Sequence, residues 1–275
     1  MRSLFRMMFI AVAGIIFSGC DNEVLIVPDA NLAAIRAYIY AGQPVNQINI
    51  TSTLALDDES ESAEPINEAE VSLYKYGSRY DLVLSEGDSG YYSYNGEDLT
   101  IEAGDTFDIE LVWAGKVMTG TTVVPPKPQE ASLTIDTLAV PEINSRQDFI
   151  NWIMSGDNRT EISWENEERN YYYITFDNVE EEPEPIDLQL PPRFKRFITQ
   201  PFRWSRYTLS SAVVTHYGDH ELVLYRVNEE YVMLYETSGQ DSRDLNEPFS
   251  NIEGGLGIFA AFNSDTLNFT VVKER

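Results

Sequence analysis

The sequence is poor in the residues that most metal and catalytic sites need. Its 275 residues include one cysteine and two histidines, and 45 acidic side chains stand against 19 basic ones, a formal net charge of −26. A single cysteine excludes an intramolecular disulfide and a cysteine-based zinc or iron–sulfur site. Because so negative a field repels nucleic acids, we expect no nucleic-acid partner. The content of 43% hydrophobic and 12% aromatic residues is nevertheless too high for a disordered acidic chain.

Long apolar runs are absent except for one at the start of the chain. Arg2 and Arg6 precede an apolar run over residues 7–17. This run is too short to span a membrane as a permanent helix and is typical of a secretory signal peptide. We therefore expect residues 1–19 to be a signal peptide.

The only cysteine follows this run directly. Ser18 and Gly19 precede Cys20, and the segment is similar to a bacterial lipobox. The similarity implies diacylation of the cysteine thiol, cleavage before it, and acylation of the new amino group. Several acyl chains anchor a protein almost permanently, so the sequence predicts a membrane contact through lipid at Cys20 and an acidic tether over residues 20–30. The alternative is a buried free cysteine beside an ordinary signal peptide.

Short stretches rich in apolar residues, separated by turn residues, predict a chain built from β-strands. From residue 68 to residue 124 such stretches recur at intervals of roughly eight to twelve residues, as in antiparallel sandwiches. Residues 125–128 contain three prolines, which break a strand ladder and mark a domain boundary. We predict an all-β fold of two consecutive immunoglobulin-like or transthyretin-like sandwiches, over residues 31–126 and 127–275.

Two short helices are predicted within the second sandwich. Ser145 can cap the first of them, which Gly156 would end. Asn228 can cap the second, which Gly239 would end.

Several segments occur in the order in which a known family has them. They are the lipobox, an early strand at residues 35–40, the segments at 66–73 and 102–107, the proline boundary, and a glycine-rich segment at 251–259. In this combination the chain resembles the Bacteroidota lipoprotein family known as domain of unknown function 4249. The resemblance implies a lipoprotein of the outer membrane, facing the cell surface and often encoded beside a TonB-dependent transporter. It supplies no catalytic residues.

A basic and aromatic segment at residues 191–207 stands out in this acidic chain. Arginine and aromatic side chains are enriched in the hot spots of protein interfaces, so this segment is a candidate partner contact. The alternative is that it folds back onto the acidic residues 180–184 and covers the second sandwich. The candidate contact residues are Arg193, Lys195, Arg196, Arg203, Trp204 and Arg206.

Other patterns that could indicate a metal site or a catalytic site are incomplete. His216 and His220 are spaced as metal ligands on a helix would be, but Gly218 between them predicts a loop. A triad of Ser210, His216 and Asp219 lacks the glycine-flanked turn of a hydrolase nucleophile. We therefore expect no metal site, no cofactor and no enzymatic activity.

Two short patterns predict a modification. Thr137 and Thr266 each lie between an aspartate and a leucine, which resembles the acceptor of O-glycosylation in Bacteroidota proteins. The alternative is that both threonines are ordinary strand-edge residues.

These features together predict a non-enzymatic outer-membrane lipoprotein, an accessory binding subunit of a TonB-dependent transporter or a similar envelope assembly. The alternative is a structural or adhesive protein of the cell envelope with no transporter partner. An enzyme would show a site motif, and none is visible in the sequence.

Overall fold

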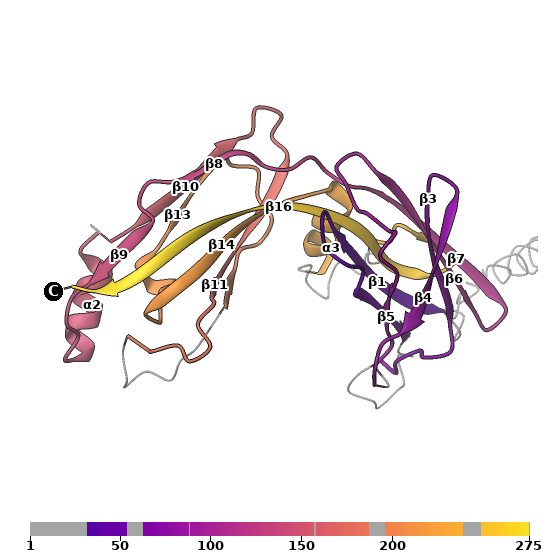
Figure 1. Cartoon of the computed structure of the whole chain (residues 1–275), viewed down its shortest axis with the longest axis horizontal. Coiled ribbons are helices and arrows are strands. Elements are labelled where there is room, and N and C mark those ends of the chain that lie inside the picture. The colour runs from indigo at the N-terminus through magenta and orange to yellow at the C-terminus, as the bar shows by residue number, and fades with distance from the viewer. Residues whose placement is uncertain are drawn as a thin grey trace, which may run out of the picture. The chain divides into compact units, whose positions relative to one another are not determined.

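The fold consists almost wholly of β-strands (Figure 1). Cys20, Arg193 and Lys195, which carry the predicted lipidation and part of the basic segment, lie outside the described residues. The computed structural model describes residues 32–53, 63–87, 89–156, 158–186, 196–238 and 249–274.

The strands fall on both sides of the proline boundary. Those before it are β1 (Ala33–Tyr40), β2 (Gln47–Ser52), β3 (Glu70–Lys75), β4 (Ser78–Leu84), β5 (Tyr91–Ser93), β6 (Thr106–Trp113) and β7 (Lys116–Val123). Those after it are β8 (Gln129–Leu133), β9 (Thr137–Val140), β10 (Thr160–Glu165), β11 (Tyr171–Asn178), β12 (Arg196–Ile198), β13 (Arg206–Leu209), β14 (Gly218–Val227), β15 (Ile252–Glu253) and β16 (Leu256–Lys273).

One long strand, β16, connects the strands of both halves. The main sheet follows the order β12-β11-β14-β16-β1-β2-β5-β4-β3-β6-β7-β15, and β13-β10-β8 form a separate sheet. β1 runs parallel to the first part of β16, from Ala34 opposite Leu256 to Tyr40 opposite Phe262. β14 runs antiparallel to the rest, and β9 pairs with the last residues of β16. Figure 1 shows β16 in yellow, running beside β14 and then beside β1.

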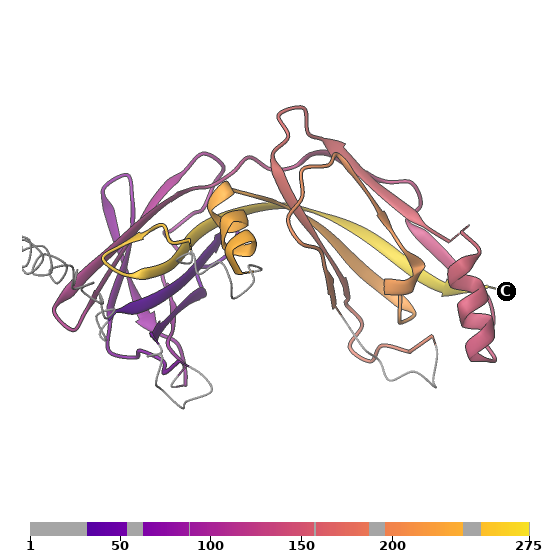
Figure 2. The ribbon, with the colours of Figure 1, turned by 180° about the vertical axis from the view of Figure 1, so that it is seen from behind.

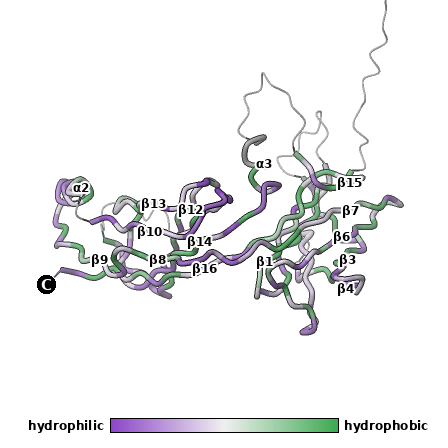
Figure 3. Tube along the Cα trace, turned by 90° about the horizontal axis from the view of Figure 1, so that it is seen from above, coloured by the Kyte–Doolittle hydropathy of each residue, from purple (hydrophilic) through white to green (hydrophobic). Residues whose placement is uncertain are grey.

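Two hydrophobic cores lie on either side of the proline boundary. Ile35, Leu73 and Phe107 are buried in the first core, and Trp164 and Leu222 are buried in the second. Hydrophobic and hydrophilic residues alternate along the strands, as Figure 3 shows, because successive side chains of a strand point to opposite faces. The predicted all-β sandwich fold is confirmed.

The end of the chain differs from the predicted division at residue 127. Phe259 and Ala261 of β16 are buried in the first core, together with Ile252 of β15. Phe269 and Val271 of the same β16 are buried in the second core. The range 127–275 therefore does not form the second sandwich alone, because an 18-residue strand is long enough to serve two cores.

Both predicted helices are present. α2 spans Arg146–Met154 and begins after Ser145, whose hydroxyl accepts a hydrogen bond from the Asp148 amide at 3.2 Å. α3 spans Glu229–Ser238 and begins directly after Asn228. A short 3-10 helix spans Ser211–Val213. Among the described residues, no helix has the length and apolarity that a membrane crossing requires.

Gly257 provides a test of the pairing between β1 and β16. Its φ is +115°, and a Cβ there would overlap the carbonyl oxygen of Ile35 and lie 2.7 Å from the Ile35 amide nitrogen. Gly42 also has a positive φ, +71°, but no atom lies near the position of its Cβ. We expect Gly257→Ala to lower the free energy of unfolding by more than about 2 kcal/mol, because backbone strain and a clash add together.

The matched variant Gly42→Ala should cost only about 1 kcal/mol, from backbone strain alone. Urea unfolding of both variants measures the difference. Equal losses would show that β1 does not approach β16 as closely as described.

Candidate functional site

The two faces of β11 carry different side chains. Tyr172, Ile174 and Phe176 are buried in the second core. Because side chains alternate along a strand, Tyr171 and Tyr173 lie on the opposite face of the sheet. This opposite face is the surface from which we build the candidate site.

Neighbouring strands add further aromatic rings to the same face. Tyr173 stacks on Tyr225 of β14 with ring centroids 4.6 Å apart, and Tyr40 of β1 stacks on Phe262 of β16 at 4.8 Å. Aromatic pairs of this kind contribute about 0.5–1.5 kcal/mol each beyond the area that they bury. We call this surface the tyrosine face; its members are Tyr38, Tyr40, Tyr171, Tyr173, Tyr225 and Phe262.

Helix α3 covers part of the tyrosine face, as Figure 2 shows. Tyr231 of α3 packs edge-on against Phe262, with centroids 4.9 Å apart, and against Tyr38 at 5.7 Å. Tyr40 and Tyr225 remain half-buried. The face is therefore fixed by the helix at one part and partly accessible at another.

Two arginines of the predicted contact lie at opposite ends of β11 on this face. Arg196 of β12 pairs across the strands with Asp177, with 3.3 Å between Nε and Oδ1. Arg203 lies over the Tyr171 ring, 3.8 Å from its centroid, and its guanidinium donates a hydrogen bond to the Tyr171 hydroxyl. The same guanidinium lies 3.8 Å from Oε1 of Glu229 in α3. The sequence predicted these two residues as contacts, but the composition of their own segment did not show which tyrosines adjoin them.

Burial controls the protonation of the phenols. It raises the pKa of Tyr40 to about 12, with the nearby Tyr225 and Tyr38 hydroxyls adding to the effect. Burial also raises the pKa of Tyr173 far above its ordinary value. The hydroxyls of Tyr40 and Tyr173 therefore stay neutral at physiological pH, and they can donate and accept hydrogen bonds. They do not provide a phenolate base or nucleophile.

Trp204 and Arg206 lie elsewhere. The side chain of Trp204 is 67% exposed and belongs to none of the buried clusters. Arg206 begins β13, in which Leu209 is buried and Tyr207 packs against the second core, so Arg206 points away from that core. The structure thus separates Arg206, on β13 of the smaller sheet, from Arg196, on β12 of the main sheet, and Trp204 lies on no strand.

The predicted fold-back onto residues 180–184 is wrong for the described arginines. Glu184 instead pairs with Lys273 at 2.7 Å, and Glu180 accepts a hydrogen bond from the Asp219 amide at 2.9 Å. The same alternative also has the segment cover the second sandwich. In this respect it is partly correct, because Phe202 packs on Trp164 with ring centroids 5.9 Å apart.

The two histidines are buried structural residues, each 3% exposed. The His220 ring stacks on Phe176 with centroids 4.7 Å apart, and its Nδ1 lies 3.0 Å from the Gly218 carbonyl oxygen. Burial lowers the pKa of His220, which favours the neutral ring. No group of three metal-ligating side chains occurs among the residues that the structure describes.

The Ser210 hydroxyl does not engage the neighbouring histidines. It accepts a hydrogen bond from the Ala212 amide at 3.3 Å and so caps the 3-10 helix. His216 Nδ1 lies 2.8 Å from the Thr215 hydroxyl instead. The three residues of the weak triad are therefore not aligned as a nucleophile and its base.

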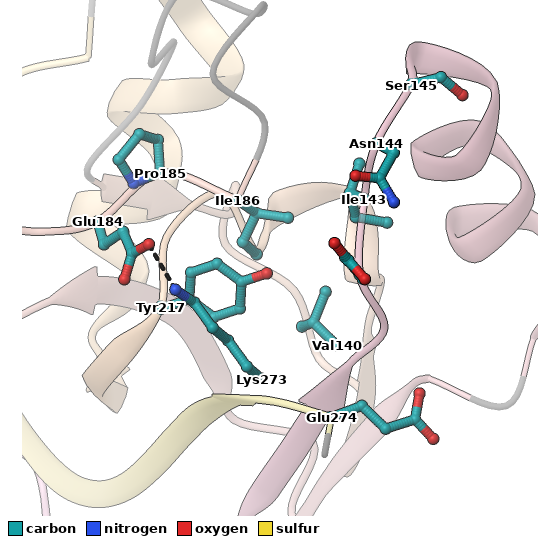
Figure 4. A pocket seen from close by; sticks show the side chains of 11 residues that line it. Val140, Ile143, Asn144, Ser145, Glu184, Pro185, Ile186, Tyr217, Lys273 and Glu274 are labelled. Carbon is teal, nitrogen blue, oxygen red and sulfur yellow. Dashed lines mark hydrogen bonds and ion pairs between the residues drawn. The ribbon is translucent and has the colours of Figure 1, made fainter.

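A pocket of about 530 Å³ lies where β9 and β16 end, and the sequence gave no indication of it. Figure 4 shows Lys273 pointing toward Glu184, next to Tyr217. The ion pair with Glu184 offsets the charge of Lys273, and Glu142 and Glu274 line the pocket as further carboxylates. This arrangement leaves no free cation for an acidic ligand.

The side chains of Thr137 and Thr266 are both exposed. The Thr137 hydroxyl donates a hydrogen bond to Asp136 at 3.1 Å, and Asp265 pairs with Lys127 at 2.8 Å. O-glycosylation at the two threonines stays a prediction.

Comparisons with known proteins identify a family and little else. The family model described as "Domain of unknown function (DUF4249)" matches residues 23–268. No curated protein matches the chain.

Three solved structures are similar at 13% identity or less. Domains A168-A170 from titin share 10% identity over 88% of this chain and 67% of that one, with a TM-score of 0.21. A Ca2+-stabilized adhesin that helps an Antarctic bacterium reach out and bind ice shares 13% identity over 90% and 50%, with a TM-score of 0.22. DIP-gamma IG1+IG2 shares 7% identity over 90% and 100%, with a TM-score of 0.20. These scores support no inference about residues or function.

Substitutions of two tryptophans test whether the basic segment contributes Trp204 to the core. Trp164 is 5% exposed in the second core, whereas Trp204 is 67% exposed. We expect Trp164→Ala to lower the free energy of unfolding by about 3–5 kcal/mol, as large-to-small core substitutions do. Trp204→Ala should change it by less than about 1 kcal/mol. Urea unfolding measures both, and a large loss for Trp204→Ala would show that this side chain is a core residue.

Proposed function

We propose that this chain, which belongs to the family described as "Domain of unknown function (DUF4249)", is a non-enzymatic outer-membrane lipoprotein that binds a partner protein of the envelope. The partner that we propose is a TonB-dependent transporter. The lipobox that ends at Cys20 supports the membrane anchor. The tyrosine face supports the binding role.

The composition of the tyrosine face is the observation that carries the binding role. Tyrosine and arginine are enriched among residues that dominate protein interfaces, and tyrosine offers a large rigid surface at a small cost in conformational entropy. Half-buried Tyr225 lies opposite Tyr173 of β11, and Arg203 and Arg196 lie at the two ends of that strand. Half-buried Tyr40 lies opposite Phe262 on the same face.

The charge of the chain adds to this argument. In a protein with a formal net charge of −26, arginines on an aromatic surface give a local contrast in sign. Such contrast favours one docking orientation and repels wrong partners. The two arginines therefore suit an acidic rim on the partner.

Lipid anchoring is tested by Cys20→Ser. We expect the wild-type protein in the membrane fraction and the variant in the soluble fraction, because no thiol is then present to accept the lipid. Cell fractionation with immunoblotting measures the distribution, and circular dichroism of the purified variant checks the fold. Membrane retention of folded Cys20→Ser protein would contradict a lipid anchor.

Partner binding is tested by reversing the charge of the face. We expect at least about tenfold less transporter to co-purify in mild detergent with the double variant Arg196→Glu/Arg203→Glu than with the wild-type protein. Substitution of a hot-spot residue often weakens binding by more than about 1.4 kcal/mol. Quantitative mass spectrometry of the purified complex measures this loss.

The matched control is Arg79→Glu/Arg206→Glu, which makes the same charge change on β4 and β13. Arg79 lies on β4 and Arg206 on β13, and neither belongs to the tyrosine face. Equal losses from both double variants would contradict a role for the face. A wild-type protein that brings down no TonB-dependent transporter would favour the structural or adhesive alternative.

A further inference from the structure

A second pocket, of about 410 Å³, adjoins the start of helix α3, and its lining includes three arginines, Arg169, Arg203 and Arg226. Arg203 reaches it from the segment before β13, and Arg226 reaches it from β14. Three arginines at one pocket are notable in a chain with 19 basic residues against 45 acidic ones. The remaining wall includes Pro125, Pro126, Asn228 and the turn before β11.

Neither Arg226 nor Arg203 donates a hydrogen bond to a carboxylate. Arg226 lies 3.8 Å from Oε2 of Glu168, and Arg203 lies 3.8 Å from Oε1 of Glu229. An N–H···O hydrogen bond needs about 2.7–3.2 Å between the heavy atoms. Since each guanidinium carries about five N–H groups, donors are left for another acceptor.

Most other ion pairs among the described residues are shorter, although Arg196 and Asp177 lie 3.3 Å apart. Lys75 lies 2.6 Å from Asp105, and Lys127 lies 2.8 Å from Asp265. The two long pairs at the pocket therefore differ from the usual pairing within the same molecule.

The burial of the partners is also unequal. The Arg226 side chain is 17% exposed, whereas that of Glu168 is 81% exposed. Arg203 and Glu229 are 43% and 71% exposed. Asn170 donates a hydrogen bond to Glu168 at 3.2 Å, on the exposed side. An exposed carboxylate can turn into solvent at little cost, since exposed ion pairs contribute little to stability. The guanidinium of Arg226 is more fixed, and the Tyr172 hydroxyl contacts it.

We propose that this pocket binds a small oxyanion, that is, a carboxylate-, phosphate- or sulfate-bearing ligand. Arg226 and Arg203 hold its oxygens by charge-assisted hydrogen bonds, for which the planar guanidinium is well suited. Glu168 and Glu229 turn outward when the anion enters. The proposal shares Arg203 with the proposed partner contact, but its test does not, because Arg226 and Glu168 are not part of the tyrosine face.

Isothermal titration calorimetry of the purified protein in non-ionic detergent tests the site. The probes are sodium phosphate, sodium sulfate and sodium citrate at constant ionic strength in sodium chloride. We expect one-to-one binding of at least one probe, and a loss of at least about tenfold in affinity with Arg226→Gln. Phosphate or sulfate binding would indicate a tetrahedral anion, and citrate binding a carboxylate ligand.

Glu168→Gln gives the sharper result, because the exposed side chain can be replaced without loss of the fold. Removing this carboxylate should raise the affinity about two- to fivefold, since it competes with the anion for Arg226. The matched control is Glu167→Gln, which removes the same charge one position away and does not line the pocket. Glu167→Gln should change the affinity by less than about half of the change that Glu168→Gln produces.

Three results would overturn the proposal. They are an absence of heat from all three probes, equal gains for Glu168→Gln and Glu167→Gln, and unchanged binding by folded Arg226→Gln protein. If Arg226→Gln fails to fold, the comparison of the two glutamate variants still decides the question.

Discussion

The structure depends on the pairing of β16 with strands from both halves of the chain. Phe262 lies opposite Tyr40 of β1 and opposite Val227 of β14, so one residue of β16 has partners from both sides. The adjoining residues of β16 alternate between two buried surfaces. Phe259 and Ala261 point into the first core. Ile258, Ala260 and Phe262 lie on the other side of the strand, in the cluster that includes the tyrosine face. The strand thereby connects the first core to the candidate binding surface.

This pairing places the tyrosines of distant segments on one surface. Tyr40 lies near the start of the chain, and Tyr225 lies far beyond the proline boundary, yet their ring centroids are 6.0 Å apart. Three side-chain contacts fix the boundary segment nearby. Asn263 donates to the Pro125 carbonyl at 2.9 Å, and Asn228 donates to the Val123 carbonyl at 2.6 Å. Lys127 adds the ion pair with Asp265. The surface and the arginine pocket therefore both depend on this crossing.

Local sequence patterns predicted much of the fold, but they could not predict which strands distant in the sequence pair with each other. The Ser145 cap, the start of α3 after Asn228 and the strand alternation follow from local chemistry, which a sequence displays. Alternation shows which residues of a strand share a face, but it does not show which sheet the strand joins. The local pattern therefore placed residues 127–275 in one sandwich, whereas Phe259 and Ala261 of β16 pack in the first core.

The candidate site was predicted in part for the same reason. Arg196 and Arg203 were identified by composition, but composition could not separate them from Trp204, which lies on no strand, or from Arg206, which lies on the smaller sheet. A signal for the tyrosine face was present: tyrosines two residues apart occur at Tyr38 and Tyr40 and again at Tyr171 and Tyr173. Such spacing places both rings of a pair on one face of a strand. Only the register of β16 with β1 and β14 shows that the two pairs share one surface.

The shared strand is tested most directly by hydrogen exchange in two matched variants. Phe259 and Phe269 are 0% and 1% exposed, in the first and the second core of the same strand. If β16 couples the cores, Phe259→Ala and Phe269→Ala should each speed amide exchange in both cores, because one cooperative unit opens. Mass spectrometry of peptides from β6 and from β14 measures the two cores separately. Faster exchange confined to the mutated core in each variant would contradict the coupling.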